Sequence, residues 1–520
     1  MEKKCEGIRA RDGHIVPVLV TGDAKLHLGS CYDGAYAAKI WADTYISPRT
    51  ENVIFFGMGD CQILLELSRR VPGMIVVYEP EPLVYQQMKT TTLYKKVIKN
   101  SKVYLFCGDC KDKLDQTIKD LLDDDWVERT MVIAHPGCQG WYEKEWIDLM
   151  GICQQICDDI TFMRAPLKRF AVSMIQNQIA NLKRLKGGVP LRRLRKDWNP
   201  DVPVILISAG PSLEKNVDEL RNVRGRAILF CVDAALPALL RHDIIPDVMV
   251  SVDSAKDMGC FEDERCRTIP LLGSSNTRKD IFERGTGPVI WGYDHQQVLQ
   301  MMDRAGIPLP RVPYYLGVST AMYSAVVELG ARVIILVGQD LAFAKSGESH
   351  VQGRDESALQ VERIPTEGYD GGEVWSRMDW MEFKKWFEKM IIRYPDHLVV
   401  NATEGGVRIK GTKQQPLAEV VKALSDTENQ LTELLQTPDN QISKEEYAVM
   451  EEQMRQCVKD LAEIRKWGYH KTFFEKDYRR IPVVSMILLY MKVLDDEREL
   501  RFEKALTFIE KELKSGGWDA

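Results

Sequence analysis

The chain has 520 residues and a formal net charge of −6, with 45% hydrophobic and 28% charged residues. This composition is ordinary for a soluble globular protein of two to four domains, and the charge gives no reason to expect nucleic acid as the main partner. The start, MEKKCEGIRARDG, lacks the apolar region of a signal peptide, and no run approaches the length of a membrane span. The 12 cysteines follow no disulfide-scaffold spacing, so we expect a cytoplasmic protein.

The first 150 residues predict a Rossmann-like domain. A polar turn and an amphipathic helix over 26–46, with Ala37, Ile40, Trp41 and Tyr45 near one face, come first. Strands are then expected at 53–56, 74–78, 102–107 and 131–134, with a helix after the first strand, and this alternation is typical of a parallel sheet.

The turn after the first of these strands is Gly57-Met58-Gly59-Asp60, which lacks the third glycine of the dinucleotide-binding fingerprint. We therefore interpret residues 1–150 as a domain kept for structure or partner binding, although Glu79 does end the second strand as in cofactor-binding relatives. Cys107 and Cys110 form a lone CxxC pair, which we interpret as buried thiols rather than a metal site.

Three further regions follow. Residues 151–200 are mostly helical, and their basic stretch 183–196 is interpreted as a solvated linker or, alternatively, a patch for an acidic partner. Residues 201–415 predict a second α/β unit, and residues 416–520, with an apolar stretch at 481–493, a helical region. The fold class is therefore two Rossmann-like parallel-sheet domains in tandem with a C-terminal helical region. In the second unit we expect strands at 204–208, 227–232, 248–252, 269–273, 288–291, 333–338 and 398–401.

The segment PVILISAGPSLE, residues 203–214, is the clearest candidate for a ligand site. An apolar run predicts a buried strand, and a helical pattern over 213–223 follows directly. Gly210 allows close approach to the backbone, Pro211 suits the first helical position, and Ser212 adds a hydroxyl. The sequence thus predicts an anion site at a helix N-terminus.

Other polar residues follow the remaining strands of this unit, where ligands bind in doubly wound sheets. As a set, these residues predict one polar site at a shared sheet edge. They are Asp233, Asp253, Ser274, Asn276, Gly317, Ser319, Thr320 and Asp340, with His350 in the next loop.

Several segments that contain these residues are similar to segments of a known protein family. The segments SAGPSL, VDAAL, PDVMVSVD, GVSTAMYSAVVELGARVIILVGQDLAF and NATEGG resemble the motility accessory factor (Maf) family of flagellin glycosyltransferases. Their central domain is shared with MptE-like pterin pyrophosphokinases and is similar to the bacterial sialyltransferases of glycosyltransferase family 42. The sialyltransferase-like pattern has asparagines where this chain has Ala209 and Asp233.

The resemblance implies transfer of a nonulosonic acid, of the pseudaminic or legionaminic type, from its CMP donor to Ser or Thr of flagellin. No cofactor or metal is implied, since one phosphate can be held at a helix N-terminus. A base for the acceptor hydroxyl is then needed, and we expect His350 to supply it. Asp340 either orients a site residue or caps a turn. His295 is the alternative base, and His242 is interpreted as structural.

Two other functions stay open. An MptE-like pyrophosphokinase would use ATP, with Asp233 and Asp253 binding Mg²⁺. A non-catalytic factor would hold flagellin through the helical ends of the chain. Strict Mg²⁺ dependence with ATP turnover would favour the first. Loss of both donor binding and glycosylation on changing the GPSL turn would favour the transferase over the second.

Overall fold

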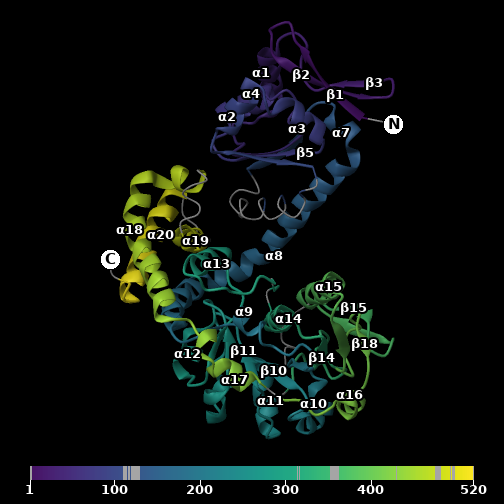
Figure 1. Cartoon of the computed structure of the whole chain (residues 1–520), viewed down its shortest axis with the longest axis vertical. Coiled ribbons are helices and arrows are strands. Elements are labelled where there is room, and N and C mark those ends of the chain that lie inside the picture. Colours follow the sequence, from purple (N-terminus) through teal and green to yellow (C-terminus); the bar gives the residue numbers. More distant parts are fainter. Residues whose placement is uncertain are drawn as a thin grey trace. The chain divides into compact units, whose positions relative to one another are not determined.

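The structure, a computed structural model, describes residues 3–108, 110, 114, 118, 129–312, 314–315, 317–351, 362–428, 430–474, 482–491, 493–494 and 498–518. The chain divides into two compact units. The N-terminal unit comprises Met1–Arg169 and Asp460–Leu506, and the central unit comprises Phe170–Lys459 and Thr507–Ala520. Each unit contains a parallel sheet, and the chain ends in helices, which confirms the predicted fold class (Figure 1).

The N-terminal unit is built on a four-stranded parallel sheet in the order β6-β5-β4-β7. Its strands are β4 (Asn52–Phe56), β5 (Ile75–Glu79), β6 (Val103–Cys107) and β7 (Thr130–Ala134), as the apolar runs predicted. Helices α1 (Gly34–Tyr45), α2 (Gln62–Arg70), α3 (Pro82–Met88) and α4 (Thr92–Ile98) accompany them (Figure 1). Because β4 comes first in the chain and lies between β5 and β7, the strand order reverses between β4 and β7.

Residues 3–27 form a three-stranded antiparallel sheet that the sequence analysis did not predict. It consists of β1 (Lys3–Arg9), β2 (Ile15–Thr21) and β3 (Ala24–His27). Helix α1 is amphipathic as expected, with Trp41 buried, but Ile40 and Tyr45 are 47% and 51% exposed. The predicted apolar face was therefore partly wrong, because the buried residues of the helix are Gly34, Ala38, Trp41 and Ala42, and Ala37 is exposed as well.

The central unit contains a nine-stranded sheet in the order β18-β17-β14-β9-β10-β11-β12-β13-β8. All seven strands expected in this region are present: β9 (Val204–Ile207), β10 (Ile228–Val232), β11 (Val248–Val250), β12 (Leu271–Gly273), β13 (Val289–Trp291), β14 (Val333–Val337) and β17 (Leu398–Asn401). Ile207 lies opposite Cys231 on one side and Val337 on the other, so β9 is central and fully buried. The order of the sheet reverses between β9 and β14.

Two predictions for this unit were wrong. The basic stretch 183–196 is no solvated linker, because its apolar residues Leu185, Leu191 and Leu194 are buried and β8 (Val189–Pro190) pairs with β13. The helix predicted over 213–223 is a four-residue α10 (Leu213–Asn216) followed by the 3₁₀ segment η2 (Val217–Val223). Edge strand β18 (Lys413–Gln414) and the hairpin of β15 (Ile364–Glu367) and β16 (Glu373–Ser376) were not predicted.

Further helical segments connect the strands and form the C-terminal part of the chain. In chain order they are α7 (Cys138–Trp141), α8 (Glu143–Asn181), η1 (Leu182–Leu185), α9 (Leu191–Leu194), η3 (Asp233–Ala235), α11 (Leu236–Arg241), η4 (Met258–Phe261), η5 (Glu264–Thr268), α12 (Lys279–Arg284), α13 (Gln296–Arg304), α14 (Val318–Leu329), α15 (Met378–Arg393), α16 (Leu417–Ala423), α17 (Leu431–Gln436), η6 (Pro438–Asn440), α18 (Lys444–Phe474), α19 (Pro482–Met491) and α20 (Arg498–Ser515).

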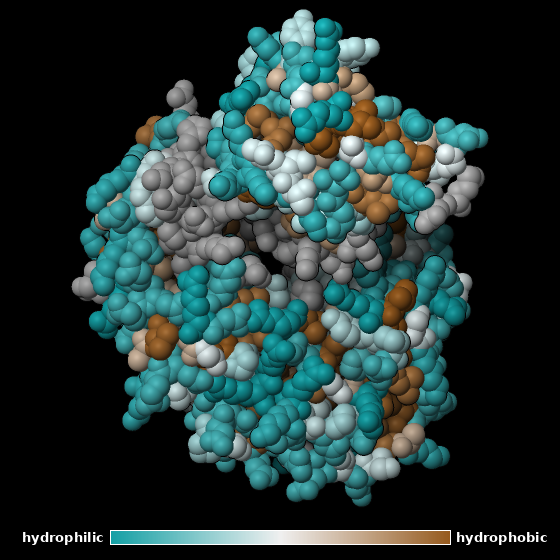
Figure 2. Space-filling model, turned by 45° about the horizontal axis from the view of Figure 1, so that its top comes forward, coloured by the Kyte–Doolittle hydropathy of each residue, from teal (hydrophilic) through white to brown (hydrophobic). Residues whose placement is uncertain are grey.

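The C-terminal helices include the apolar stretch at 481–493, most of which forms α19, while Ile481 and Lys492 lie outside the described residues. Helix α18 contains a break at Gly468, where φ is 73°. In the described part of the chain, no helix combines the length and apolarity that a membrane crossing requires. Figure 2 shows a mainly hydrophilic face with separate apolar patches.

Candidate functional site

A cavity of about 200 Å³ lies in the central unit at the carboxyl ends of β9, β10 and β14. This is the point where the strand order reverses, which is where open α/β sheets bind their ligands. Six of the predicted site residues line it: Gly210, Asp233, Gly317, Ser319, Asp340 and His350. Six others are not part of its wall: Pro211, Ser212, Asp253, Ser274, Asn276 and Thr320.

The turn after β9 already holds an anion, the carboxylate of Asp340. The Ser212 hydroxyl donates to Asp340 Oδ2 at 2.7 Å, and the Ser212 N–H donates to Oδ1 at 3.2 Å. The Gly210 N–H donates to the Gly338 carbonyl at 2.8 Å. The prediction of N–H groups left free for a ligand at this turn was therefore wrong, since protein acceptors occupy them and α10 is only one turn long.

The same contacts explain why position 210 is glycine. A Cβ there would lie 1.9 Å from Asp340 Oδ2 and 2.4 Å from the Gly338 carbonyl. Burial raises the pKa of Asp340 to about 6, although the bonds from Ser212 favour its ionised form. Asp340 thus joins the turn after β9 to the end of β14, and this connection shapes the cavity wall.

A buried ion pair supplies the cationic group of the cavity. Lys256 Nζ lies 2.6 Å from Asp233 Oδ1, and the Ser251 hydroxyl donates to Asp233 Oδ2 at 2.7 Å. The side chains of Lys256 and Asp233 are 11% and 1% exposed. Burial disfavours the charged ammonium and lowers the pKa of Lys256. The attraction of the Asp233 carboxylate is stronger than this effect, so the pKa of Lys256 is raised. Lys256 therefore stays charged at the cavity wall.

A longer helix also begins at this cavity. Helix α14 has 12 residues, its N-cap is Gly317, and its first residues Val318 and Ser319 line the cavity. The N–H groups of a first helical turn have no intrahelical partner and attract negative charge. Thr320 does not reach the cavity, because its hydroxyl lies 2.7 Å from the carbonyl oxygens of Tyr315 and Gly317 and shapes the helix start. The helix N-terminus available to an anion is thus that of α14.

Aromatic side chains and a histidine complete the wall. Trp380 and Phe383, one turn apart on α15, line the cavity, and Trp380 packs on Phe343 at 4.8 Å between ring centroids. His350 lines it too, with Nδ1 2.8 Å from the Ser349 hydroxyl. Residues 352–361, which follow this histidine, lie outside the described part of the chain.

The other predicted residues have contacts elsewhere. Asp253 is exposed and accepts from the Ala255 N–H at 2.9 Å, as an ordinary turn residue does. Ser274 and Asn276 are buried at the end of β12, where the Asn276 amide contacts the ring of the exposed His295. His242 Nδ1 lies 3.0 Å from Asp218 Oδ1, away from the cavity.

Lys256, Trp380 and Phe383 were not predicted from the sequence. The segment VDSAKD did contain a lysine three residues after Asp253, which was the available signal. The aromatic pair has no comparable signal, because its spacing is that of any buried helix face. Among the residues that the structure describes, no group of three or more His, Cys, Asp or Glu side chains is arranged to hold a metal ion.

Comparisons with known proteins agree with this fold. Residues 176–346 match the family model described as 6-hydroxymethylpterin diphosphokinase MptE-like. The whole structure is similar to that of a MAf glycosyltransferase from Magnetospirillum magneticum AMB-1, with a TM-score of 0.56 and 14% sequence identity. That similarity covers 99% of this chain and 91% of the other. The resemblance found in the sequence is thereby confirmed at the level of the fold.

A curated relative matches a short segment. It is an uncharacterized protein of Treponema pallidum (strain Nichols), 34% identical over 55 residues. The match spans 11% of this chain and 26% of that relative.

Proposed function

We propose that this protein is a glycosyltransferase that moves a nonulosonic acid, of the pseudaminic or legionaminic type, from a CMP donor to Ser or Thr of flagellin. The observation that carries the proposal is the cavity at the β9–β14 reversal, with Lys256 and the α14 N-terminus in its wall. The fold shared with a MAf glycosyltransferase supports the reaction class.

The donor fits the chemistry of the cavity wall. A CMP sugar carries one phosphate, and Lys256 together with the first N–H groups of α14 offers a cation and a helix dipole. Trp380 and Phe383 offer aromatic surface for the cytosine ring. Gly317 and Ser319 belong to this donor site, whereas Gly210 and Asp340 shape its wall.

Transfer then requires one bond to break and one to form. The bond between the anomeric carbon and the phosphate oxygen breaks, and CMP leaves with the negative charge that Lys256 stabilises. The acceptor hydroxyl oxygen attacks the same carbon, and its proton passes to the imidazole of His350. No metal is required, since the protein supplies the positive charge at the leaving group.

We also propose that different regions of the chain have different roles. Residues 201–415 act as the catalytic domain, residues 1–150 as a Rossmann-like domain, 151–200 as a helical connection and 416–520 as a helical domain. The terminal regions select flagellin before its export, so the reaction takes place in the cytoplasm. The cavity itself supports only the donor half of this assignment, because all its residues belong to the central unit.

The pyrophosphokinase alternative rests on the match of residues 176–346 to the MptE-like model. It would need carboxylates for Mg²⁺, but Asp233 is paired with Lys256, and Asp253 lies in an exposed turn outside the cavity. Calorimetry with CMP and with ATP, each with EDTA or with Mg²⁺, distinguishes the two. We expect CMP to bind equally in EDTA, whereas Mg²⁺-dependent ATP binding with weak CMP binding would favour the pyrophosphokinase.

A further inference from the structure

The N-terminal unit contains a second cavity, of about 220 Å³, which the proposed function does not use. Asp60 from the β4–α2 turn and His135, directly after β7, line it, together with Ser30 and residues of α1. It lies at the carboxyl ends of β4 and β7, where the strand order of this sheet reverses. The position is therefore the ligand-binding position of an open α/β sheet.

The groups that would bind a dinucleotide are already hydrogen-bonded within the protein in this unit. Glu79, at the end of β5, is 1% exposed and accepts from the N–H groups of Met58 at 2.7 Å and Glu81 at 2.9 Å. Its oxygens are thus bonded to the backbone rather than presented to a ribose. At the start of α2, Asp60 Oδ1 accepts from the Gln62 N–H at 2.9 Å. A carboxylate stands where a phosphate would bind, so the turn repels anionic ligands.

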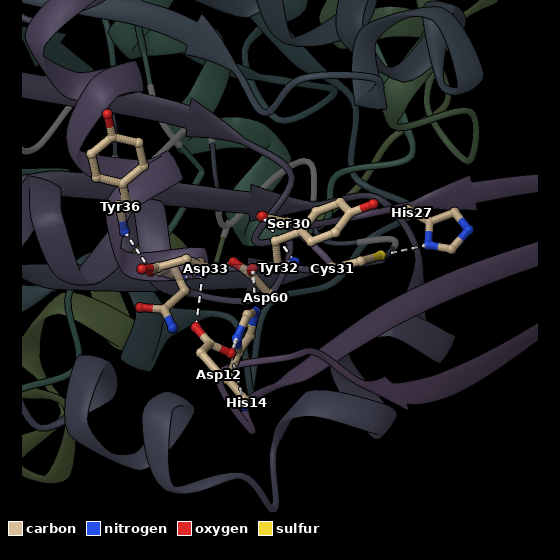
Figure 3. A network of polar contacts seen from close by, with 11 residues as sticks. Asp12, His14, His27, Ser30, Cys31, Tyr32, Asp33, Tyr36 and Asp60 are labelled. Atoms are coloured by element: carbon tan, nitrogen blue, oxygen red, sulfur yellow. Dashed lines mark hydrogen bonds and ion pairs between the residues drawn. The ribbon is translucent and has the colours of Figure 1, made fainter.

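The charge of Asp60 is balanced from within the unit. Its Oδ2 lies 3.1 Å from His14 Nε2, and His14 Nδ1 contacts Asp12 (Figure 3). The hydrogen bond to Asp60 and the contact with Asp12 raise the pKa of His14 to about 9, although burial by itself would lower it. Asp60 is 2% exposed, and its carboxylate can accept about four hydrogen bonds, of which the described residues supply two. It thus presents acceptor capacity to the cavity, and because one imidazolium is shared by two carboxylates, the cluster of Asp12, His14 and Asp60 keeps one negative charge.

His135 provides a second acceptor. The ring is 4% exposed, and Nδ1 lies 2.8 Å from the Pro136 carbonyl, so Nδ1 carries the hydrogen. Burial lowers the pKa of His135, which keeps the ring neutral at pH 7 and leaves Nε2 as an acceptor. Nε2 makes no hydrogen bond among the described residues, and a Cβ on Gly59 would lie only 2.4 Å from it. The absence of a side chain at Gly59 therefore makes room for the imidazole ring of His135.

The rest of the wall is partly polar and partly apolar. The Ser30 hydroxyl accepts from the Tyr32 N–H at 3.3 Å (Figure 3). Its own hydrogen has no acceptor among the described residues and can be donated to a ligand. Ala37, Ala38 and Trp41 of α1 form the apolar part. The turn leading to α2 also holds Cys61 at φ 68°, a left-handed conformation of the kind that concentrates at binding sites.

We propose that this cavity binds an uncharged, hydroxyl-rich ligand of about the size of one sugar ring. Hydroxyl groups both donate and accept, and the wall offers Asp60 and His135 as acceptors and Ser30 as a donor. The apolar face of a sugar ring matches Trp41 and the alanines of α1. The volume corresponds to about seven water molecules at about 30 Å³ each, which suits a monosaccharide and is too small to enclose a dinucleotide.

The test is saturation-transfer NMR on the full chain with glucose, N-acetylglucosamine, glucose 6-phosphate and NAD as probes. Ala37→Phe fills the cavity from an exposed helix position, and Ala35→Phe is the matched control outside the cavity. We expect at least one neutral sugar to bind, the phosphate and NAD to bind at least tenfold more weakly, and only Ala37→Phe to weaken the sugar by tenfold or more.

Three results would each overturn the proposal. They are no binding of either neutral sugar, equal or tighter binding of glucose 6-phosphate or NAD, and sugar binding that Ala37→Phe leaves unchanged. Should Ala37→Phe fail to fold, Ser30→Ala provides the second variant, since it removes one donor without adding volume. A Ser30→Ala protein that binds the sugar as tightly as the parent would also contradict the assignment. Far-UV circular dichroism and the thermal unfolding transition, compared with those of the parent protein, serve as the control for folding in every variant.

Discussion

Replacement of Lys256 by methionine tests the donor site most sharply. The change keeps the length of the buried side chain and removes the cation that lies 2.6 Å from Asp233. A hydrogen bond to a charged group contributes about 1.5–3 kcal/mol, so the affinity for CMP should fall roughly 10- to 150-fold. The variant should also be less stable by about 3–5 kcal/mol, because Asp233 is left as a buried carboxylate for which Ser251 is the remaining side-chain donor among the described residues.

A double variant separates the effect on CMP affinity from the effect on stability. Lys256→Met with Asp233→Asn removes both charges of the pair, so stability should largely return while CMP binding stays weak. Calorimetry with CMP and urea unfolding of the parent, the single variant and the double variant provide the measurements. Lys385→Met, on an exposed lysine of α15 that pairs with Glu382, is the charge control. The reasoning is refuted if both Lys256 variants bind CMP as tightly as the parent.

Three further predictions concern the base, the turn after β9 and the N-terminal unit. His350→Ala should bind CMP normally and transfer roughly 10²–10⁴-fold more slowly in single-turnover assays, and a parent-like rate would assign the base elsewhere, with His295→Ala tested beside it. Gly210→Val should lower the urea midpoint, because its Cβ would lie 1.9 Å from Asp340 Oδ2, and an unchanged midpoint would contradict that contact. The pKa of His14 is raised from 6.5 to about 9, so its stabilisation is complete below about pH 6.5 and is lost as the pH rises through 9. Thermal unfolding from pH 6 to 9.5 should show this loss in the parent and not in His14→Gln, and equal slopes in both proteins would disprove it.

The strands could be predicted because each is a short apolar run that ends on small or polar residues. That pattern located β9, β10 and β14 and, with them, the sheet edge where Asp233 and His350 line the cavity. Strand β8 escaped prediction because it has two residues, too few for any periodicity. The N-terminal antiparallel sheet was not predicted, because β1 and β3 are mostly exposed and contain few apolar residues.

The error at the turn after β9 has a different origin. Ser212 and Asp340 are 128 residues apart, and nothing in the segment GPSL reveals that a carboxylate from the end of β14 will reach its hydroxyl. For the same reason, the partner of Asp233 could not be read from the sequence, although Lys256 follows in the same loop region. Local pattern locates the ends of strands, whereas the pairing of side chains across those ends depends on tertiary packing.

The most direct test of the proposed function is the intact mass of flagellin after incubation with this protein and a CMP-activated nonulosonic acid in EDTA. We predict that the mass rises by whole nonulosonic acid residues, that one CMP is released for each, and that His350→Ala leaves flagellin unmodified over the same time. Flagellin of unchanged mass with the parent protein and an intact donor would contradict the account, and ATP turnover dependent on Mg²⁺ under matched conditions would replace it with the pyrophosphokinase function.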